Sequence, residues 1–262
     1  MGKWLLRLCV LMLCVSYGSA EDDIHIATLK EQCNKANDAS ACDHLGAIYQ
    51  DAQDYTQASV FYTKACEGGS SVSCNELGTF YENGLGVKRN GAKAIALYAK
   101  ACRGGDGMGC RNAGAMYYLG KAGVKKDLVK ARDYINKACG FNQGESCGML
   151  GIMYQYGQGV KKNNAKALEF HEKACNLGVG DGCFFAGFLL REKKEYAKAR
   201  KLYEKSCELD NASACLHLAA MYGDGLGVRQ DYKKAKELVG KGCDLGDQQG
   251  CDVYKLLNNA GY

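Results

Sequence analysis

The sequence predicts an all-helical protein, an α/α solenoid assembled from a repeated unit of about 36 residues. Fourteen of the 16 cysteines form seven closely spaced pairs, and the second member of each pair follows the previous one after 32 to 37 residues. Small and aromatic residues recur four, seven and eight positions from these cysteines, and such spacings are neighbours on one stripe of a helix. Proline, which would interrupt a helix, is absent from all 262 residues. Internal periodicity of this kind is the signature of a repeat architecture.

The first 20 residues have the layout of a secretory signal peptide. Lys3 and Arg7 precede an apolar run from Leu8 to Val15, and the small residues Gly18 and Ala20 follow it. The run is shorter than the roughly 20 apolar residues that a membrane-spanning helix needs. We therefore predict cleavage after Ala20 and a secreted or periplasmic location.

The remaining residues, 21–262, are predicted to be a single solenoid domain of about seven repeats. Without Lys3 and Arg7 the chain has 32 basic and 29 acidic residues, a formal charge of about +3. This charge is too small to indicate nucleic-acid binding, where a clustered basic face and a pI above about 9 are expected. No later apolar run is long enough to cross a membrane, so we predict no membrane insertion. We also expect a monomer without a nucleic-acid partner.

Each unit is predicted to contain two helices joined by a loop. Helix A begins near the second cysteine of a pair, with a glycine four residues on and a tyrosine seven residues on, as at Gly78 and Tyr81. Helix B ends at the next first cysteine, with an alanine eight residues before it, as at Ala94. Glycine within a helix costs about 1 kcal/mol relative to alanine, so its recurrence predicts close approach of a neighbouring backbone. In four units a glycine-rich loop such as residues 84–87 predicts a glycine cap at the end of helix A.

The recurring pattern L-G-x-x-Y-x-x-G-x-G-V…K-A…Y-x-K-A-C resembles the Sel-one-like repeat, a relative of the tetratricopeptide repeat. With seven residues between the cysteines of six pairs, it is similar more narrowly to the Helicobacter cysteine-rich proteins, a family with members catalogued as β-lactamases. The resemblance covers residues 24–262. It implies a right-handed superhelix of antiparallel, tetratricopeptide-like helix pairs with an extended concave surface.

The paired cysteines are predicted to form disulfides. Zinc sites favour C-x2-C spacing and redox sites use C-x-x-C in a βαβ setting, and these pairs have neither. A short turn between antiparallel helices would bring two cysteines to the Cα separation of about 5.5–6 Å that suits a bridge, and export would keep the bridge oxidised. The predicted pairs are Cys33–Cys42, Cys66–Cys74, Cys102–Cys110, Cys139–Cys147, Cys175–Cys183, Cys207–Cys215 and Cys243–Cys251.

The residues themselves predict no catalytic, metal or cofactor site. Serine β-lactamases use S-x-x-K with S-D-N and K-T-G motifs, and no serine in this chain has a lysine three residues on. The histidines at positions 25, 44, 171 and 217 share no short ligand spacing. The family resemblance nevertheless implies β-lactam binding or weak hydrolysis, so β-lactams and cell-wall peptides stay alternative ligands.

One stripe of helix A varies between units while its neighbours stay fixed: the positions one, two and five after the second cysteine. In tetratricopeptide-like arrays the A helices line the concave groove, so we predict that this stripe is exposed there. Asn75, Arg111 and Asn112 would grip a peptide backbone, and Phe184 and Phe185 would supply the apolar anchor that dominates binding energy. The alternative for the phenylalanines is that they fill the core.

Lysines recur two and nine residues before the first cysteine of a pair, as at Lys100 and Lys93. They are either a basic track for an acidic partner or a solvated helix face. The sequence therefore favours an exported scaffold that binds a protein or an extended peptide along its concave face. The alternative is a β-lactam-binding protein or weak β-lactamase.

Overall fold

The computed structural model describes residues 20–35 and 38–259, which contain fourteen α-helices, one short 3-10 helix and no strand. The predicted signal peptide lies outside the described residues except for Ala20, which begins the first helix. The α-helices are α2 (Ala20–Lys35), α3 (Ala39–Asp51), α4 (Tyr55–Glu67), α5 (Ser71–Asn83), α6 (Gly91–Arg103), α7 (Gly107–Leu119), α8 (Leu128–Gly140), α9 (Gly144–Tyr156), α10 (Asn164–Asn176), α11 (Gly180–Glu192), α12 (Tyr196–Glu208), α13 (Ala212–Asp224), α14 (Tyr232–Asp244) and α15 (Gln248–Asn259).

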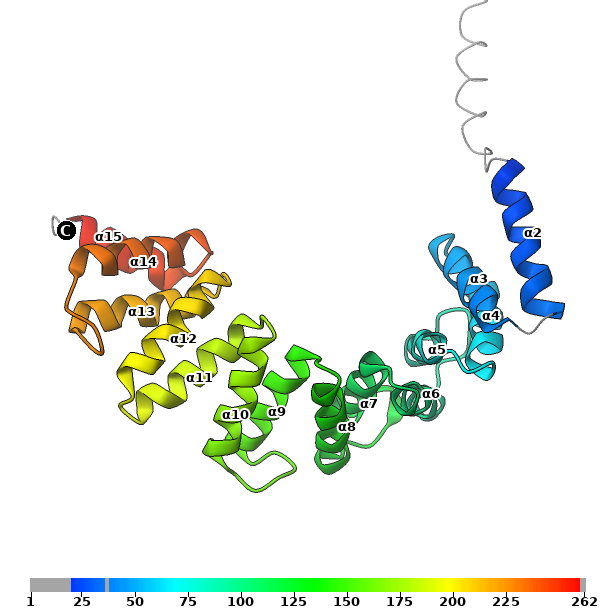
Figure 1. Ribbon diagram of the computed structural model, residues 1–262, viewed down its shortest axis with the longest axis horizontal. Coiled ribbons are helices and arrows are strands. Elements are labelled where there is room, and N and C mark those ends of the chain that lie inside the picture. Colours follow the sequence, from blue (N-terminus) through cyan, green and yellow to red (C-terminus); the bar gives the residue numbers. More distant parts are fainter. Residues whose placement is uncertain (1–19, 36–37, 260–262) are drawn as a thin grey trace, which may run out of the picture.

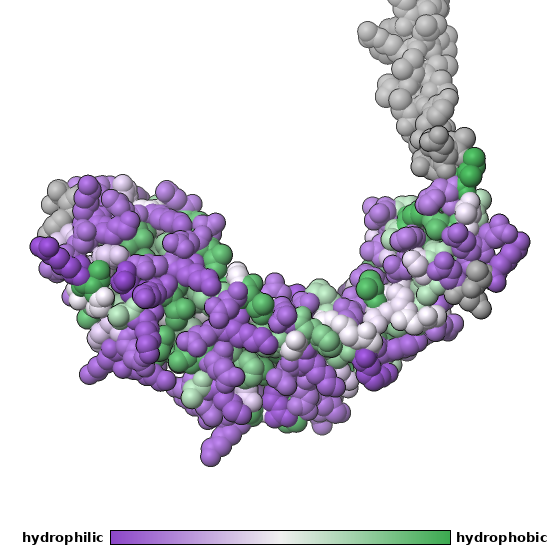
Figure 2. Space-filling model, in the orientation of Figure 1, coloured by the Kyte–Doolittle hydropathy of each residue, from purple (hydrophilic) through white to green (hydrophobic). Residues whose placement is uncertain are grey.

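The helices follow one another along an open arc, with α2 and α15 at its two ends (Figure 1). We call α3, α5, α7, α9, α11 and α13 the A helices, and α4, α6, α8, α10, α12 and α14 the B helices. Each A helix packs against the B helix that follows it and against the helix before it, which is α2 for α3 and a B helix for the others. The predicted all-helical solenoid is confirmed, and Figure 2 shows the hollow inner side of the arc.

Helices α3 to α14 are each 13 residues long because both ends are fixed by local chemistry. Most begin at an Asp, Asn or Ser whose side chain accepts hydrogen bonds from the first free backbone amides; Asp106, for example, accepts from Met108 and Gly109. In the four units with long loops, helix A ends at a glycine in the left-handed region, such as Gly84 with φ of 79°. The predicted glycine caps are confirmed.

In three of the four long loops, a second glycine lies against the start of the preceding unit's B helix, whereas Gly123 in the fourth has nothing within 4 Å of an added Cβ. A Cβ at Gly86 would lie 2.3 Å from the carbonyl oxygen of Tyr55, the residue that begins α4. Gly159 has the same relation to Leu128, the first residue of α8. Because only glycine permits this approach, the loop of one unit can rest on the start of the previous B helix.

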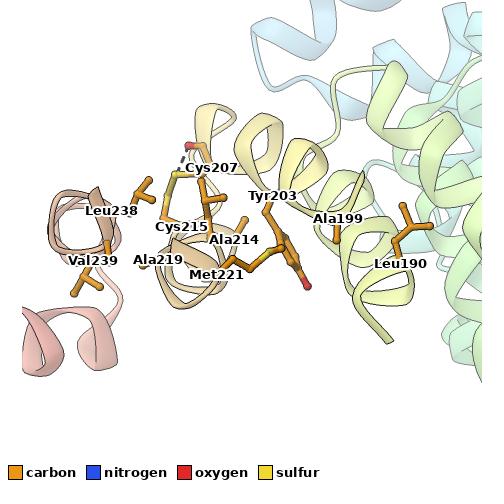
Figure 3. Close-up of a cluster of buried hydrophobic side chains, with 12 residues drawn as sticks. Leu190, Ala199, Tyr203, Cys207, Ala214, Cys215, Ala219, Met221, Leu238 and Val239 are labelled. Atoms are coloured by element: carbon orange, nitrogen blue, oxygen red, sulfur yellow. Dashed lines mark hydrogen bonds between the residues drawn. A yellow bond between two sulfur atoms is a disulfide. The ribbon is translucent and has the colours of Figure 1, made fainter. Parts of the chain in front are cut away.

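The glycine within helix A packs mainly against a large side chain of its own B helix. The predicted approach of a backbone holds only at Gly114 and Gly187, where an added Cβ would lie 3.3 Å from the carbonyl oxygens of Ala131 and Ala199. An added Cβ would lie 2.5–3.0 Å from that side chain in five units. The pairs are Gly46 with Tyr62, Gly78 with Tyr98, Gly114 with Ile135, Gly151 with His171, and Gly187 with Tyr203. In the sixth unit the smaller Val239 occupies the B-helix position, and there the glycine is replaced by Ala219, within one buried cluster (Figure 3).

Each of the seven predicted cysteine pairs forms a disulfide in the structure, with Cα atoms 4.5–4.8 Å apart. The bridge joins the end of one B-type helix to the start of the next A-type helix, as Cys66 of α4 to Cys74 of α5. Twelve of these cysteines are buried, whereas Cys243 and Cys251 at the last junction are half-buried. The bridges therefore connect successive hairpins along the whole described array.

Candidate binding surface

The variable stripe brings the A helices of neighbouring units into direct polar contact. The Asn112 side chain on α7 donates from Nδ2 to Oδ1 of Asn75 on α5, at 2.8 Å. One unit further, Nη1 of Arg111 lies 2.9 Å from Oε2 of Glu145 on α9. The three predicted peptide-gripping residues are therefore brought together, and each already contacts a neighbouring helix.

The expectation that all five groove residues are exposed is wrong for Asn75. Its residue surface is only 7 % exposed, and its Nδ2 donates to Glu76 Oε1 at 3.3 Å. Position one of the stripe points partly into the junction with the next A helix, and this junction buries the amide. Arg111 and Asn112 are half-buried.

The two predicted aromatic anchors belong to a cluster of rings and are half-buried. The ring of Phe184 lies 5.1 Å from His217 and 5.8 Å from Tyr203, measured between centroids. Phe185 lies 5.3 Å from Phe184 and stacks on the buried His171 at 5.2 Å. Both phenylalanines therefore fill core space in part, because each ring packs against a buried ring.

A hollow of about 170 Å³ opens on the stripe between α9 and α11, beside Phe185. It is lined by Glu145, Gly148, Met149, Ile152, Val179, Asp181, Gly182 and Phe185. Of the five predicted groove residues, only Phe185 lines this hollow. Gly148, Met149 and Ile152 line it without having been predicted, although they occupy the variable positions one, two and five of their unit.

Two buried or half-buried ionisable groups adjoin this surface. Burial lowers the pKa of His171 to about 4, and neither ring nitrogen has a hydrogen-bond partner. Burial is also the main reason that the pKa of Glu76 is raised, with the nearby carboxylates of Asp106 and Asp43 adding to it. The Glu76 carboxylate forms no ion pair with any described residue. A cation beside it would therefore be stabilised.

The recurring lysines have structural partners. Nζ of Lys100 donates to the carbonyl of Cys66, and Nζ of Lys241 to that of Cys207, both at 2.7 Å. Each amine thereby satisfies a carbonyl at the end of the preceding B helix. The lysines nine residues before the cysteine lie over tyrosine rings in three units: Lys93 over Tyr81, Lys130 over Tyr117, and Lys166 over Tyr154. These contacts favour the interpretation of a solvated helix face over that of a basic track.

Within residues 20–35 and 38–259, no three His, Cys, Asp or Glu side chains lie close enough together to hold a metal ion. Over the same ranges, no helix is both long and apolar enough to cross a membrane. Three larger hollows lie elsewhere on the described residues: one beside Tyr254 on α15, one beside the first disulfide, and one of about 300 Å³ between α12, α13 and α14. The hollow between α9 and α11 differs from them because it lies on the stripe where units vary.

The chain is similar to solved repeat proteins over most of its length. A protective antigen of uropathogenic Escherichia coli strains, which displays an SLR fold, is 27% identical with a TM-score of 0.83; the alignment covers 90% of this chain and 52% of that one, so this chain spans about half of the antigen. A Sel1 repeat protein from Oxalobacter formigenes is 25% identical with a TM-score of 0.74, over 80% of this chain and 88% of that one. Cysteine-rich protein B of Helicobacter pylori is 40% identical over 50% of this chain and 92% of its own, with a TM-score of 0.40.

No curated protein sequence matches the chain. The family model of the Sel1 repeat, in contrast, matches six consecutive segments, residues 39–70, 71–106, 107–139, 144–179, 180–211 and 212–247. Each segment starts with an A helix and contains the B helix that follows, so the disulfides link one repeat to the next. The chain therefore belongs to the Sel1 repeat family.

Proposed function

We propose that this protein is an exported, monomeric scaffold that binds a protein or an extended peptide segment along the stripe of its A helices, on the concave side of the array. Sel1-type and tetratricopeptide-like repeats mediate protein interactions through such extended surfaces. Seven disulfides suit an oxidising compartment, outside the cell or in the periplasm. A signal peptide at residues 1–20 would direct the chain there.

The hollow between α9 and α11 is the observation that carries the proposal. Ligand pockets for drug-sized molecules usually measure about 300–1,000 Å³, whereas this one measures about 170 Å³. A space of this size suits a single side chain of a longer partner. Met149, Ile152 and Phe185 line it from the variable stripe, so an apolar anchor residue would enter there while the rest of the segment lies along the A helices.

Ile152→Glu tests the proposal, because a carboxylate in the hollow would oppose an apolar anchor. Partners captured from an envelope extract would be identified, and the purified binding segment would then be titrated against both proteins. We expect the variant to bind at least about 30-fold more weakly, the effect of losing a hot spot of about 2 kcal/mol. Val129→Glu is the matched control, since Val129 is exposed on the B helix α8.

The two phenylalanines are unsuitable for this test because their rings pack on His171 and Tyr203. Removing them would change stability together with binding. If the Ile152→Glu and Val129→Glu proteins bind the segment as well as the parent, the stripe is not the binding face.

The C-x7-C spacing also supports a place within the cysteine-rich branch of the family, which we propose on that motif alone. The expectation of β-lactam binding rests only on the resemblance to that branch. No group in the described residues favours it, so the scaffold is the function we propose.

A further inference from the structure

The charges of the array divide between its two kinds of helix. The six A helices carry eight carboxylates and two guanidinium groups, a formal charge of −6. The six B helices carry seventeen basic and eight acidic side chains, a formal charge of +9 with histidine neutral. The whole chain has a formal charge of only +5, so its net charge conceals acidic A helices and basic B helices.

The hollow on the A helices has an acidic rim. Glu145 on α9 and Asp181 on α11 both line it, and both are exposed. Arg111 forms an ion pair with Glu145, but its single positive charge balances only one of the two rim carboxylates. Asp181 accepts a hydrogen bond from the neutral amide of Asn211 at 2.7 Å. The rim therefore keeps a negative charge.

The interior of the hollow is apolar. Met149, Ile152, Val179 and Phe185 line it, and they come from α9, α11 and the residue that precedes α11. An aliphatic or aromatic side chain would leave water on entering, and a charged one would lose its hydration without a partner. The apolar interior and the acidic rim thus select for different parts of one ligand.

Further along the stripe, towards the N-terminus, the acidic character continues. Among the described residues neither Glu76 on α5 nor Asp43 on α3 has an ion-pair partner, and Asp43 accepts a hydrogen bond from the hydroxyl of Ser73. Cationic groups of a bound chain could approach these carboxylates while its apolar residue occupies the hollow. Charge complementarity of this kind sets partner choice and the rate of association.

We infer that the partner is an extended peptide segment in which lysine or arginine side chains flank an apolar anchor. This inference rests on the proposed function and adds the chemistry of the ligand. The anchor enters the hollow between α9 and α11, and the cations lie against Glu145, Asp181 and Glu76. An acidic or neutral segment would lack the second set of contacts.

The probes are three labelled synthetic peptides that share one leucine anchor, flanked by lysines, by serines or by glutamates. Binding to the disulfide-bonded protein is measured by fluorescence polarisation at low and high salt. We expect the lysine-flanked peptide to bind at least about tenfold more tightly than either of the others, a difference of about 1.4 kcal/mol. The preference should shrink at high salt, because the rim is exposed and its charges are screened.

Gly148→Leu fills the hollow with little risk to the fold. A Cβ at Gly148 would meet only the Cβ of Ala174, at an ordinary 3.7 Å. The variant should bind the lysine-flanked peptide at least about tenfold more weakly, by the same conversion. Gly140→Leu is the control, since nothing lies within 4 Å of its added Cβ at the end of α8. Glu145→Gln with Asp181→Asn should reduce the preference for lysine, whereas Glu169→Gln with Glu172→Gln, two exposed positions on the B helix α10, should keep it.

Two results would overturn the inference. If the serine- or glutamate-flanked peptide binds as tightly as the lysine-flanked one, and Gly148→Leu still weakens binding, the charge assignment is wrong while the proposed binding face stands. If Gly148→Leu and the parent bind every probe equally, or no probe binds, the hollow does not take a basic, apolar-anchored segment. The proposed function itself is tested separately, by comparing how tightly the parent and Ile152→Glu bind the captured partner segment.

Discussion

The packing of glycine against a ring predicts how the hairpin seam responds to a single added methyl group. In the fourth unit, a Cβ at Gly151 would lie 2.6 Å from Cε1 and Nδ1 of His171, closer than real contacts allow. Overpacking of this kind costs about 1–3 kcal/mol, and the better helix propensity of alanine returns about 1 kcal/mol. Gly151→Ala should therefore destabilise the protein by about 0–2 kcal/mol.

The same methyl group should be harmless when the ring opposite it is removed. The sixth unit already uses this combination, because Ala219 and Val239 occupy the two positions there. His171 is the cleanest partner for a double-mutant cycle, since its ring nitrogens make no hydrogen bonds that the substitution would lose. In a His171→Val background, Gly151→Ala should be neutral or stabilising, which gives a coupling energy of about 1–3 kcal/mol.

The assay is denaturant unfolding of the oxidised protein, followed by circular dichroism, for the parent, both single variants and the double variant. Gly148→Ala, three residues earlier on α9, is the control and should be neutral or slightly stabilising, because its Cβ has room. An equal cost of Gly151→Ala in both backgrounds would refute the reasoning, since the clash with His171 would then contribute nothing.

Two further predictions follow from burial. As the pH falls from about 6.5 to 4, the protein should lose about 3 kcal/mol of stability relative to His171→Val, because the unfolded chain takes up a proton near pH 6.5 and buried His171 does so only near pH 4. Urea titrations at several pH values check this, and an identical pH profile for both proteins would contradict it. Mild reductant should open Cys243–Cys251 first, because these two cysteines are less buried than the other twelve; alkylation and peptide mass mapping would show an internal pair opening first if this is wrong.

Repetition made the fold and the disulfides predictable from the sequence. One unit leaves helix and strand ambiguous, but cysteine, glycine and alanine at fixed registers in successive units define two helices and their turn. The neighbour of the helix-A glycine was not predicted, because that requires the relative rotation of the two helices. A signal was present all the same: the position four residues before the first cysteine is large wherever glycine occurs, and it is Val239 opposite Ala219.

The binding surface was predictable only in part. Variation between units located the stripe, but it could not show that Asn75 turns into the junction with α7, where Asn112 satisfies its carbonyl oxygen. Nor could it show that Gly148 leaves a hollow beside Phe185, since an empty space depends on the spacing of α9 and α11. The separation of charge between A and B helices is different, because it could be counted from the sequence as soon as the helices were assigned.

The binding face can be tested most directly by labelling surface carboxylates with and without the lysine-flanked peptide or the captured partner segment. Glu145 and Asp181 stand at the rim of the hollow on the A helices, while Glu169 and Glu172 are exposed on the B helix α10. We predict that ligand slows labelling of the first two and leaves the second two unchanged. Protection of Glu169 and Glu172 with undiminished labelling of Glu145 and Asp181 would contradict the account, because the ligand would then lie on the opposite set of helices.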